Sequence, residues 1–90
     1  GATAAAVGER LAKLGRSVQV LVVTHSPQVA AQGGSHLKVQ KASQDDSAAT
    51  TVAVLDADAR REEIARMLAG TEVTEEARAA ALSLLDRRAS

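Results

Sequence analysis

The stretch VQVLVVTHSPQVAA, residues 18–31, decides the fold class because a run of large apolar residues passes directly into a helix start. The run Val18–Val23 is almost continuously apolar, which is typical of a strand covered on both faces in a parallel sheet. Pro27 suits the first turn of a helix, since its missing N–H would have no partner there. We therefore predict a buried strand, a turn, and a short helix over Pro27–Gln32.

The polar pair Thr24-His25 occupies the turn between this strand and this helix. In open α/β sheets, ligands bind at the carboxyl ends of the strands. His25 would therefore project into the crevice above the sheet, where its imidazole could act on a ligand. The alternative is that His25 is structural and caps the helix that begins at Pro27.

Apolar periodicity predicts a helix over Ala2–Leu14, which ends at Gly15. Gly8 lies in its middle, where glycine costs about 1 kcal/mol relative to alanine. We interpret Gly8 as a place where a neighbouring element approaches closely.

The segments His36–Lys41 and Thr50–Leu55 predict a β-hairpin around the polar loop Ala42–Ala49. In the first strand Leu37 and Val39 share one face, and polar residues share the other. We expect a half-exposed strand, and its lysine residues suit a position at the edge of a sheet.

Two helices are predicted after the hairpin. The first covers about Ala57–Leu68 and is capped by Asp56 or Asp58. Its buried face would hold Ile64, Met67 and Leu68, and its water-facing side Arg60, Arg61 and Glu62. The second helix is capped by Thr74, and its buried stripe would consist of Ala77, Ala81, Leu84 and Leu85.

One doubly buried strand cannot find all its neighbours in this chain, because the hairpin supplies at most one of them. The expected fold class is therefore α/β, with an incomplete sheet, flanking helices and a β-hairpin. Residues 1–90 would form part of one larger domain.

Composition narrows the function further. The 11 basic and 11 acidic residues give zero net charge, so no global field attracts nucleic acid or an anionic membrane. The chain has no cysteine and no aromatic residue, which excludes disulfides, thiolate chemistry and base stacking on aromatics. Two histidines make a poor metal site, and no apolar run is long enough to cross a bilayer. We expect an intracellular, soluble protein with no metal site and no membrane partner.

Other candidate sites are weak. The sequence has no GxxxxGK[ST] phosphate loop. We interpret Gly33-Gly34-Ser35 as a loop without a ligand. Ser26 lacks the GxSxG context of a nucleophilic serine, and His36 is interpreted as a surface residue.

The segment LVVTHSPQVAA, residues 21–31, resembles the switch-histidine segment of the RecN family of DNA repair ATPases, relatives of the SMC and ABC ATPase heads. In that family a strand ends in Thr-His and is followed, after one residue, by Pro-Gln-Val-Ala. Ser26 stands where many members have Leu, a departure that concerns helix packing. The segment REEIARMLAG, residues 61–70, resembles the near-terminal helix of the family, and the resemblance covers essentially all 90 residues.

The resemblance implies the C-terminal portion of a P-loop ATPase head of the SMC/ABC type. The Walker A and Walker B motifs, the Q-loop, the signature motif and the coiled coil would precede Gly1. His25 would be the catalytic, nucleotide-binding switch histidine. Gly1, Ala2 and Thr3 resemble the end of the D-loop and would lie at the interface with a second head.

The resemblance also implies that the whole protein binds ATP and Mg²⁺ and hydrolyses ATP during recombinational repair of DNA double-strand breaks. Its partners would be the remainder of its own head, a second head and DNA, in the bacterial cytoplasm and at the nucleoid. The 90 residues alone are expected to bind no ATP and to be inactive.

A different class of function stays open at this point. The chain could be a self-standing, non-enzymatic α/β interaction module in which His25 is structural. Such a module should bury Val18–Val23 by itself, whereas a piece of a larger head should leave this segment uncovered.

Overall fold

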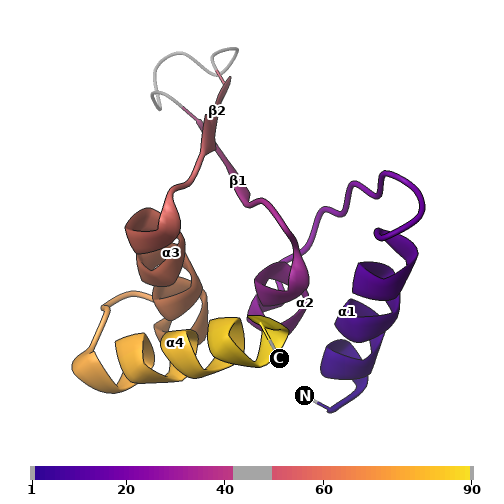
Figure 1. The fold of residues 1–90 in the computed structure, drawn as a ribbon. Coiled ribbons are helices and arrows are strands. Elements are labelled where there is room, and N and C mark those ends of the chain that lie inside the picture. Colours follow the sequence, from indigo (N-terminus) through magenta and orange to yellow (C-terminus); the bar gives the residue numbers. More distant parts are fainter. Residues whose placement is uncertain (1, 42–49, 90) are drawn as a thin grey trace.

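The computed structural model describes residues 2–41 and 50–89. Within them the chain forms four helices and one two-stranded sheet (Figure 1). In chain order the elements are α1 (Ala2–Leu14), α2 (Pro27–Gln32), β1 (Leu37–Lys41), β2 (Thr50–Val54), α3 (Ala57–Ala69) and α4 (Glu75–Ala89). The predicted helices and the predicted hairpin are therefore confirmed, and α2 has the predicted bounds.

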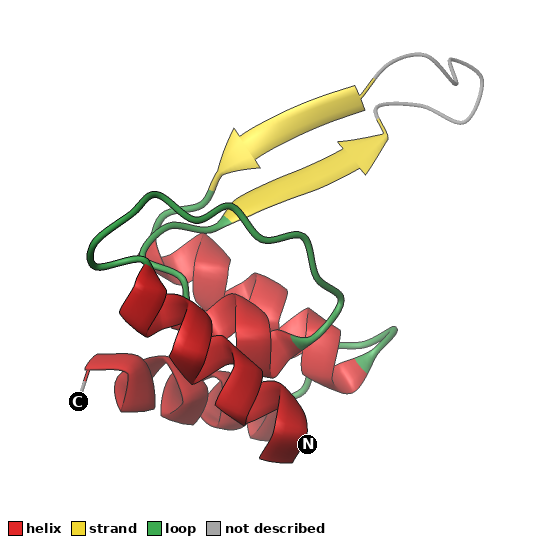
Figure 2. Ribbon diagram, turned by 90° about the vertical axis from the view of Figure 1, so that its right-hand side faces the viewer, coloured by secondary structure: helices red, strands yellow, loops and turns green. Residues whose placement is uncertain are grey.

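The short helix α2 is the central element of the helical layer. It contacts α1, α3 and α4, and α3 also packs against α4. The hairpin projects from one side of this layer (Figure 2). The helices thus form the packed part of the molecule, and the hairpin extends away from it.

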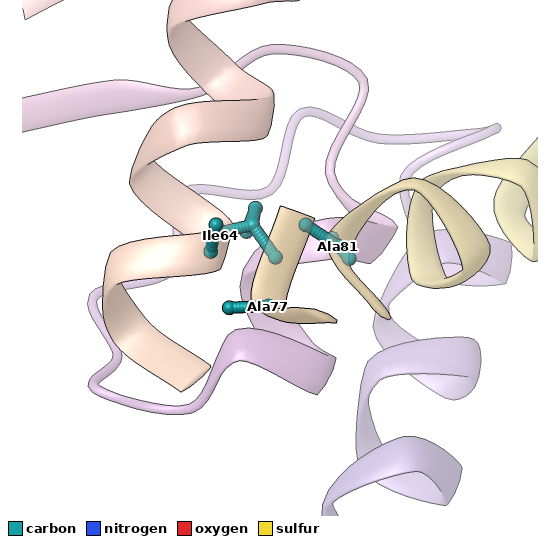
Figure 3. Packing of buried hydrophobic residues seen from close by; sticks show 5 residues of the cluster. Ile64, Ala77 and Ala81 are labelled. Atoms are coloured by element: carbon teal, nitrogen blue, oxygen red, sulfur yellow. The ribbon is translucent and has the colours of Figure 1, made fainter. Parts of the chain in front are cut away.

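The hydrophobic core lies where α2, α3 and α4 meet. Ile64 is fully buried, with alanines around it that let the helices approach one another closely (Figure 3). The other buried members are Ala31, Ala65, Ala77 and Ala81, with Ala30, Met67, Val73, Leu84 and Leu85 packed against them. The predicted stripe of the last helix is confirmed.

Local capping sets the starts of the two long C-terminal helices. The Asp56 carboxylate accepts a hydrogen bond from the backbone N–H of Ala59 at 2.8 Å, so Asp56 and not Asp58 caps α3. The Thr74 hydroxyl accepts one from the N–H of Ala77 at 3.1 Å and caps α4, as predicted. A side-chain oxygen at this position satisfies a backbone donor that the helix itself leaves unpaired.

Gly8 marks the contact between α1 and α2. A Cβ atom at Gly8 would lie 2.9 Å from Cγ of Gln32 and 3.3 Å from both the carbonyl oxygen of Gln28 and Cα of Val29. Gly8 itself is buried. The predicted close approach at Gly8 is confirmed, because any larger side chain would push the two helices apart.

The hairpin has the predicted pairing but the opposite orientation. Leu37 pairs with Val54 and Val39 with Val52 in antiparallel register, so these four apolar side chains share one face. That face is exposed, with exposures of 44% for Leu37 and 75% for Val54. Lys38, on the other face, is half-buried and reaches α3. The polar face of β1 is therefore turned towards α3 at Lys38. The predicted loop 42–49 lies outside the described residues.

The predicted buried strand Val18–Val23 is the main error in the predicted fold. After α1 the backbone makes a tight turn, in which the N–H of Val18 donates to the carbonyl of Leu14 at 3.1 Å. The chain then continues without regular secondary structure. Among the described residues, the only strands that pair are β1 and β2. A strand needs a partner for its backbone groups, and neither β1 nor β2 supplies one here.

The expected α/β class is thus confirmed in its coarse form, as helices with a small sheet. The parallel sheet is not formed by the described residues. None of the described helices is both long and apolar enough to cross a membrane.

Candidate functional site

His25 lies on the turn that joins the segment 18–24 to α2. Its side chain is exposed. Among the described residues it has no side-chain hydrogen bond or ion pair. The imidazole is therefore available to a group outside the described chain.

The residues on either side of His25 hold this turn in place. The Thr24 hydroxyl accepts a hydrogen bond from the N–H of Ser26 at 2.9 Å. The Ser26 hydroxyl accepts from the N–H of Val29 at 3.3 Å and donates to the side-chain carbonyl of Gln28 at 3.1 Å. Backbone and side chains thus fix the turn from both ends.

Ser26 is the N-cap of α2, with Pro27 in its first turn. The suggestion that His25 caps this helix is therefore wrong. Serine followed by proline is a common N-terminal sequence, because serine accepts the early N–H bonds and proline lacks one of them. The sequence contained the signal for this cap.

Arg60 is a site residue that the sequence did not indicate. It was expected to face water, but it is half-buried. Its Nη2 donates hydrogen bonds to three carbonyl oxygens at the C-terminal end of α2: Ala30 at 3.0 Å, Ala31 at 3.2 Å and Gly33 at 2.5 Å. No pattern in the sequence predicts these bonds, because the two segments are separated by about thirty residues.

Arg61 and Glu62, also expected to face water, are half-buried as well. Glu62 accepts a hydrogen bond from Arg78 of α4 at 2.8 Å. This bond lowers the pKa of Glu62, and Arg78 also binds Glu75. The Glu62–Arg78 pair links α3 to α4 and the Arg78–Glu75 pair lies within α4, so we interpret both as structural.

Glu63 is the centre of a second polar cluster, between the hairpin and α3. It is 8% exposed, accepts two hydrogen bonds from Arg66, at 2.6 and 2.8 Å, and pairs with Lys38 at 3.2 Å. The hydrogen bond from Arg66 lowers the pKa of Glu63. An open cavity of about 340 Å³ lies beside this cluster, lined by Lys38, Leu55, Ala59, Glu62, Glu63, Arg66 and Val73. Arg66 and Lys38 balance the charge of the buried Glu63 carboxylate. We therefore interpret the cluster as structural: it joins the hairpin to α3.

His36 precedes β1 instead of opening it, and its carbonyl accepts a hydrogen bond from the N–H of Leu55 at 3.0 Å. Its side chain is half-buried, so the interpretation as a surface residue is wrong. Burial, and next the nearby charge of Arg60, lower the pKa of its imidazole. His36 is thus favoured in its neutral form.

The other predicted site residues are separate from His25. Gly1 lies outside the described residues, and Ala2 and Thr3 begin α1, where Thr3 is exposed. No hydrogen bond joins Thr3 to His25 in the described part of the chain. Gly33-Gly34-Ser35 lies in the connection between α2 and β1, as expected for a loop.

The described residues contain no group of three or more His, Cys, Asp or Glu side chains that could hold a metal ion. The described residues therefore do not fit a Mg²⁺ site.

Comparison with known proteins gives the family. The chain is 51% identical over 85 residues to a protein from Xylella fastidiosa, 48% identical over 86 residues to one from Streptomyces coelicolor and 47% identical over 85 residues to one from Vibrio cholerae. Each of these relatives is named DNA repair protein RecN. The matches cover 94–96% of this chain.

The chain spans about 15% of the length of these curated relatives. No protein-family model matches it. The identity over nearly the whole chain is nevertheless high, and the matched length includes the segment around His25. The chain belongs to the RecN family.

Proposed function

We propose that this chain is part of the ATPase head of a DNA repair protein and that His25 takes part in ATP hydrolysis. The observation that carries the proposal is the state of His25: its side chain is exposed, while Thr24 and Ser26 hold the turn beneath it. An exposed side chain on a backbone turn that is fixed by hydrogen bonds is suited to a ligand supplied by another part of the protein.

The segment before His25 supports the same proposal. Val18, Leu21, Val22 and Val23 are 51%, 81%, 41% and 95% exposed. Four large exposed apolar side chains within six residues indicate a surface that another structure covers. A self-standing module would have to bury this run itself, so the exposures favour a piece of a larger head over such a module.

In ATP hydrolysis, water attacks the γ-phosphorus and the bond from that phosphorus to the bridging oxygen breaks, giving ADP and phosphate. The protein contributes mainly by positioning groups and neutralising the developing charge. His25 would donate a hydrogen bond from its ring N–H to a γ-phosphate oxygen or to the attacking water. The phosphates and Mg²⁺ would be held by the remainder of the head, because the described residues do not fit a metal site.

The whole protein would act in recombinational repair of DNA double-strand breaks, with two heads closing around ATP. The start of α1, at Ala2 and Thr3, would face the second head. These 90 residues alone would bind no ATP, since their sequence has no phosphate loop. Isothermal titration of the chain with ATP should give no heat of binding at micromolar affinity.

The decisive experiment replaces His25 by alanine in the full-length protein. Loss of a donor to the developing charge should lower the ATPase rate by about 10²–10³-fold, while nucleotide binding is retained. His36→Ala is the matched control, because it removes the other histidine at a half-buried position away from the turn. A His25→Ala protein that hydrolyses ATP within about threefold of the wild type, where a lost donor should cost far more, would show that His25 is structural.

A further inference from the structure

Arg60 joins the middle helix of the layer to the long helix α3. Its guanidinium lies at the C-terminal end of α2 and donates to the carbonyl oxygens of Ala30, Ala31 and Gly33. The last carbonyls of a helix have no partner within the helix. The Ala30 carbonyl also accepts from the N–H of Gly33 at 3.3 Å. Arg60 adds a donor to all three carbonyls and a positive charge at the helix end where a cation is favourable.

Helix α2 depends on such outside contacts. It contains only six residues, Pro27–Gln32, and helices of that length are not stable by their own hydrogen bonds. Its side against α1 is set by the close approach at Gly8. Ala31 packs in the core with residues of α3 and α4, and Arg60 bonds the C-terminal end of α2. These contacts together fix where α2 lies.

The position of α2 also decides the position of His25. Ser26 is bonded forward to Val29 in the first turn of α2 and backward to Thr24. The turn that carries His25 is thus attached to the helix, and a shift of α2 would move the imidazole with it. A displacement of about 1 Å at a reacting group can reduce a rate about a hundredfold.

We infer that Arg60 is a positioning residue for His25: it holds the far end of α2 on α3 and so fixes the turn from which the imidazole projects. This role rests on the proposed function of His25. In this role Arg60 acts on His25 through the helix that it holds, and not on the nucleotide itself.

The test uses three variants of the full-length protein. Arg60→Ala should lower kcat for ATP hydrolysis by about tenfold to a hundredfold and leave KM for ATP nearly unchanged. Arg60→Lys should recover part of the rate, because lysine keeps the charge but not the planar guanidinium. Arg61→Ala is the matched control: Arg61 is the next residue of α3, is also half-buried, and has one ion pair in the described part of the chain, at 4.0 Å to exposed Asp58. Its kcat should not change.

A double-mutant cycle separates a positioning role from a general loss of structure. If Arg60 acts through His25, then Arg60→Ala should cause almost no further loss of kcat in a His25→Ala protein. An equal loss in both backgrounds would overturn the inference. If Arg60→Ala does not fold, the same cycle with Arg60→Lys gives the answer.

Hydrogen exchange of the full-length protein provides a readout that does not require activity. Peptides covering residues 24–33 should exchange faster in Arg60→Ala than in Arg61→Ala. Unchanged exchange and unchanged kcat in Arg60→Ala, together with a large effect of His25→Ala, would reject the role of Arg60 and leave the proposed function intact. No effect of His25→Ala on kcat would reject the proposed function, and the positioning role would fall with it.

Discussion

The helical core and the segment Val18–Val23 use the same kinds of apolar residue with opposite results. Ile64 in the core is 0% exposed, whereas Val23 is 95% exposed. The core is built from helices, which satisfy their own backbone hydrogen bonds and need only one apolar face covered. A strand also needs a neighbouring strand for its backbone, and none of the described strands is available to Val18–Val23. The difference shows which part of this chain buries its apolar residues by itself and which part leaves them exposed.

The hairpin stands between these two cases. Its strands satisfy each other's backbone, but its apolar face, Leu37, Val39, Val52 and Val54, is open to solvent. The side chain of Lys38 connects the middle of the hairpin to α3 through its ion pair with Glu63 at 3.2 Å. An isolated two-stranded hairpin is at best marginally stable, so the ion pair at Glu63 matters for its placement.

The largest effect is expected at the centre of the core. Ile64→Ala should reduce the free energy of unfolding by about 2–5 kcal/mol, because it removes a fully buried side chain and leaves a cavity between α3 and α4. Urea denaturation of the chain measures this loss. Leu82→Ala, at a position 44% exposed on α4, is the control and should cost far less. Equal losses at the two positions would contradict the assigned core.

The next largest effect is expected on self-association through the exposed segment Val18–Val23. The 90-residue chain should self-associate, because its exposed apolar run lies beside unpaired backbone. Val23→Lys should weaken this association by about tenfold, because it removes the free energy gained by burying part of a valine side chain. Sedimentation at several concentrations measures it, with exposed Gln19→Lys as the charge-matched control. A wild-type chain that stays monomeric at millimolar concentration would show that the segment is not an interface.

An effect of similar size, but dependent on pH, is expected at Glu63. Folding lowers the pKa of Glu63 below its ordinary value of 4.5, mainly through the hydrogen bond from Arg66. Its contribution to stability is therefore complete above that value and is lost as the pH falls through the folded-state pKa. Glu63→Gln should cost about 1–2 kcal/mol at neutral pH and flatten this acid dependence.

Urea denaturation measures the effect of Glu63→Gln on stability. It is carried out between about pH 3 and pH 7, the range in which carboxylates titrate. Glu62→Gln is the control, since Glu62 is the adjacent carboxylate and its ion pair with Arg78 is more exposed. Glu62→Gln should change stability less than Glu63→Gln at neutral pH. The reverse order would show that the hairpin is not anchored through Glu63.

The smallest effect is expected at the contact of α1 with α2. Gly8→Ala should gain helix propensity but place a Cβ atom 2.9 Å from Gln32 and 3.3 Å from the backbone of α2. Overpacking should outweigh the propensity and give a net loss of about 1 kcal/mol. Gly15→Ala is the control, because a Cβ there would lie no closer than 3.4 Å to other atoms. If Gly8→Ala stabilises the chain, α1 is not held against α2 at this point.

The sequence by itself determined the local features of this protein. Asp56, Thr74 and Pro27 act within a few residues of their own positions, so the helix starts they predict do not depend on the rest of the fold. The Thr24-His25 turn and the family resemblance were likewise readable from adjacent residues. Gly8 was interpretable because glycine weakens the middle of a helix, and a close helix contact offsets that cost.

Only the tertiary structure decided how these elements face one another. Arg60 bonds to carbonyls about thirty residues away, and Lys38 turns the hairpin's polar face towards Glu63 on α3. Neither contact has a local sequence signal, because a long charged side chain can reach either solvent or a distant partner with the same sequence around it. The run Val18–Val23 has the composition of a buried strand. Burial and pairing depend on neighbouring strands and helices, however, and the described residues do not place such neighbours beside this run.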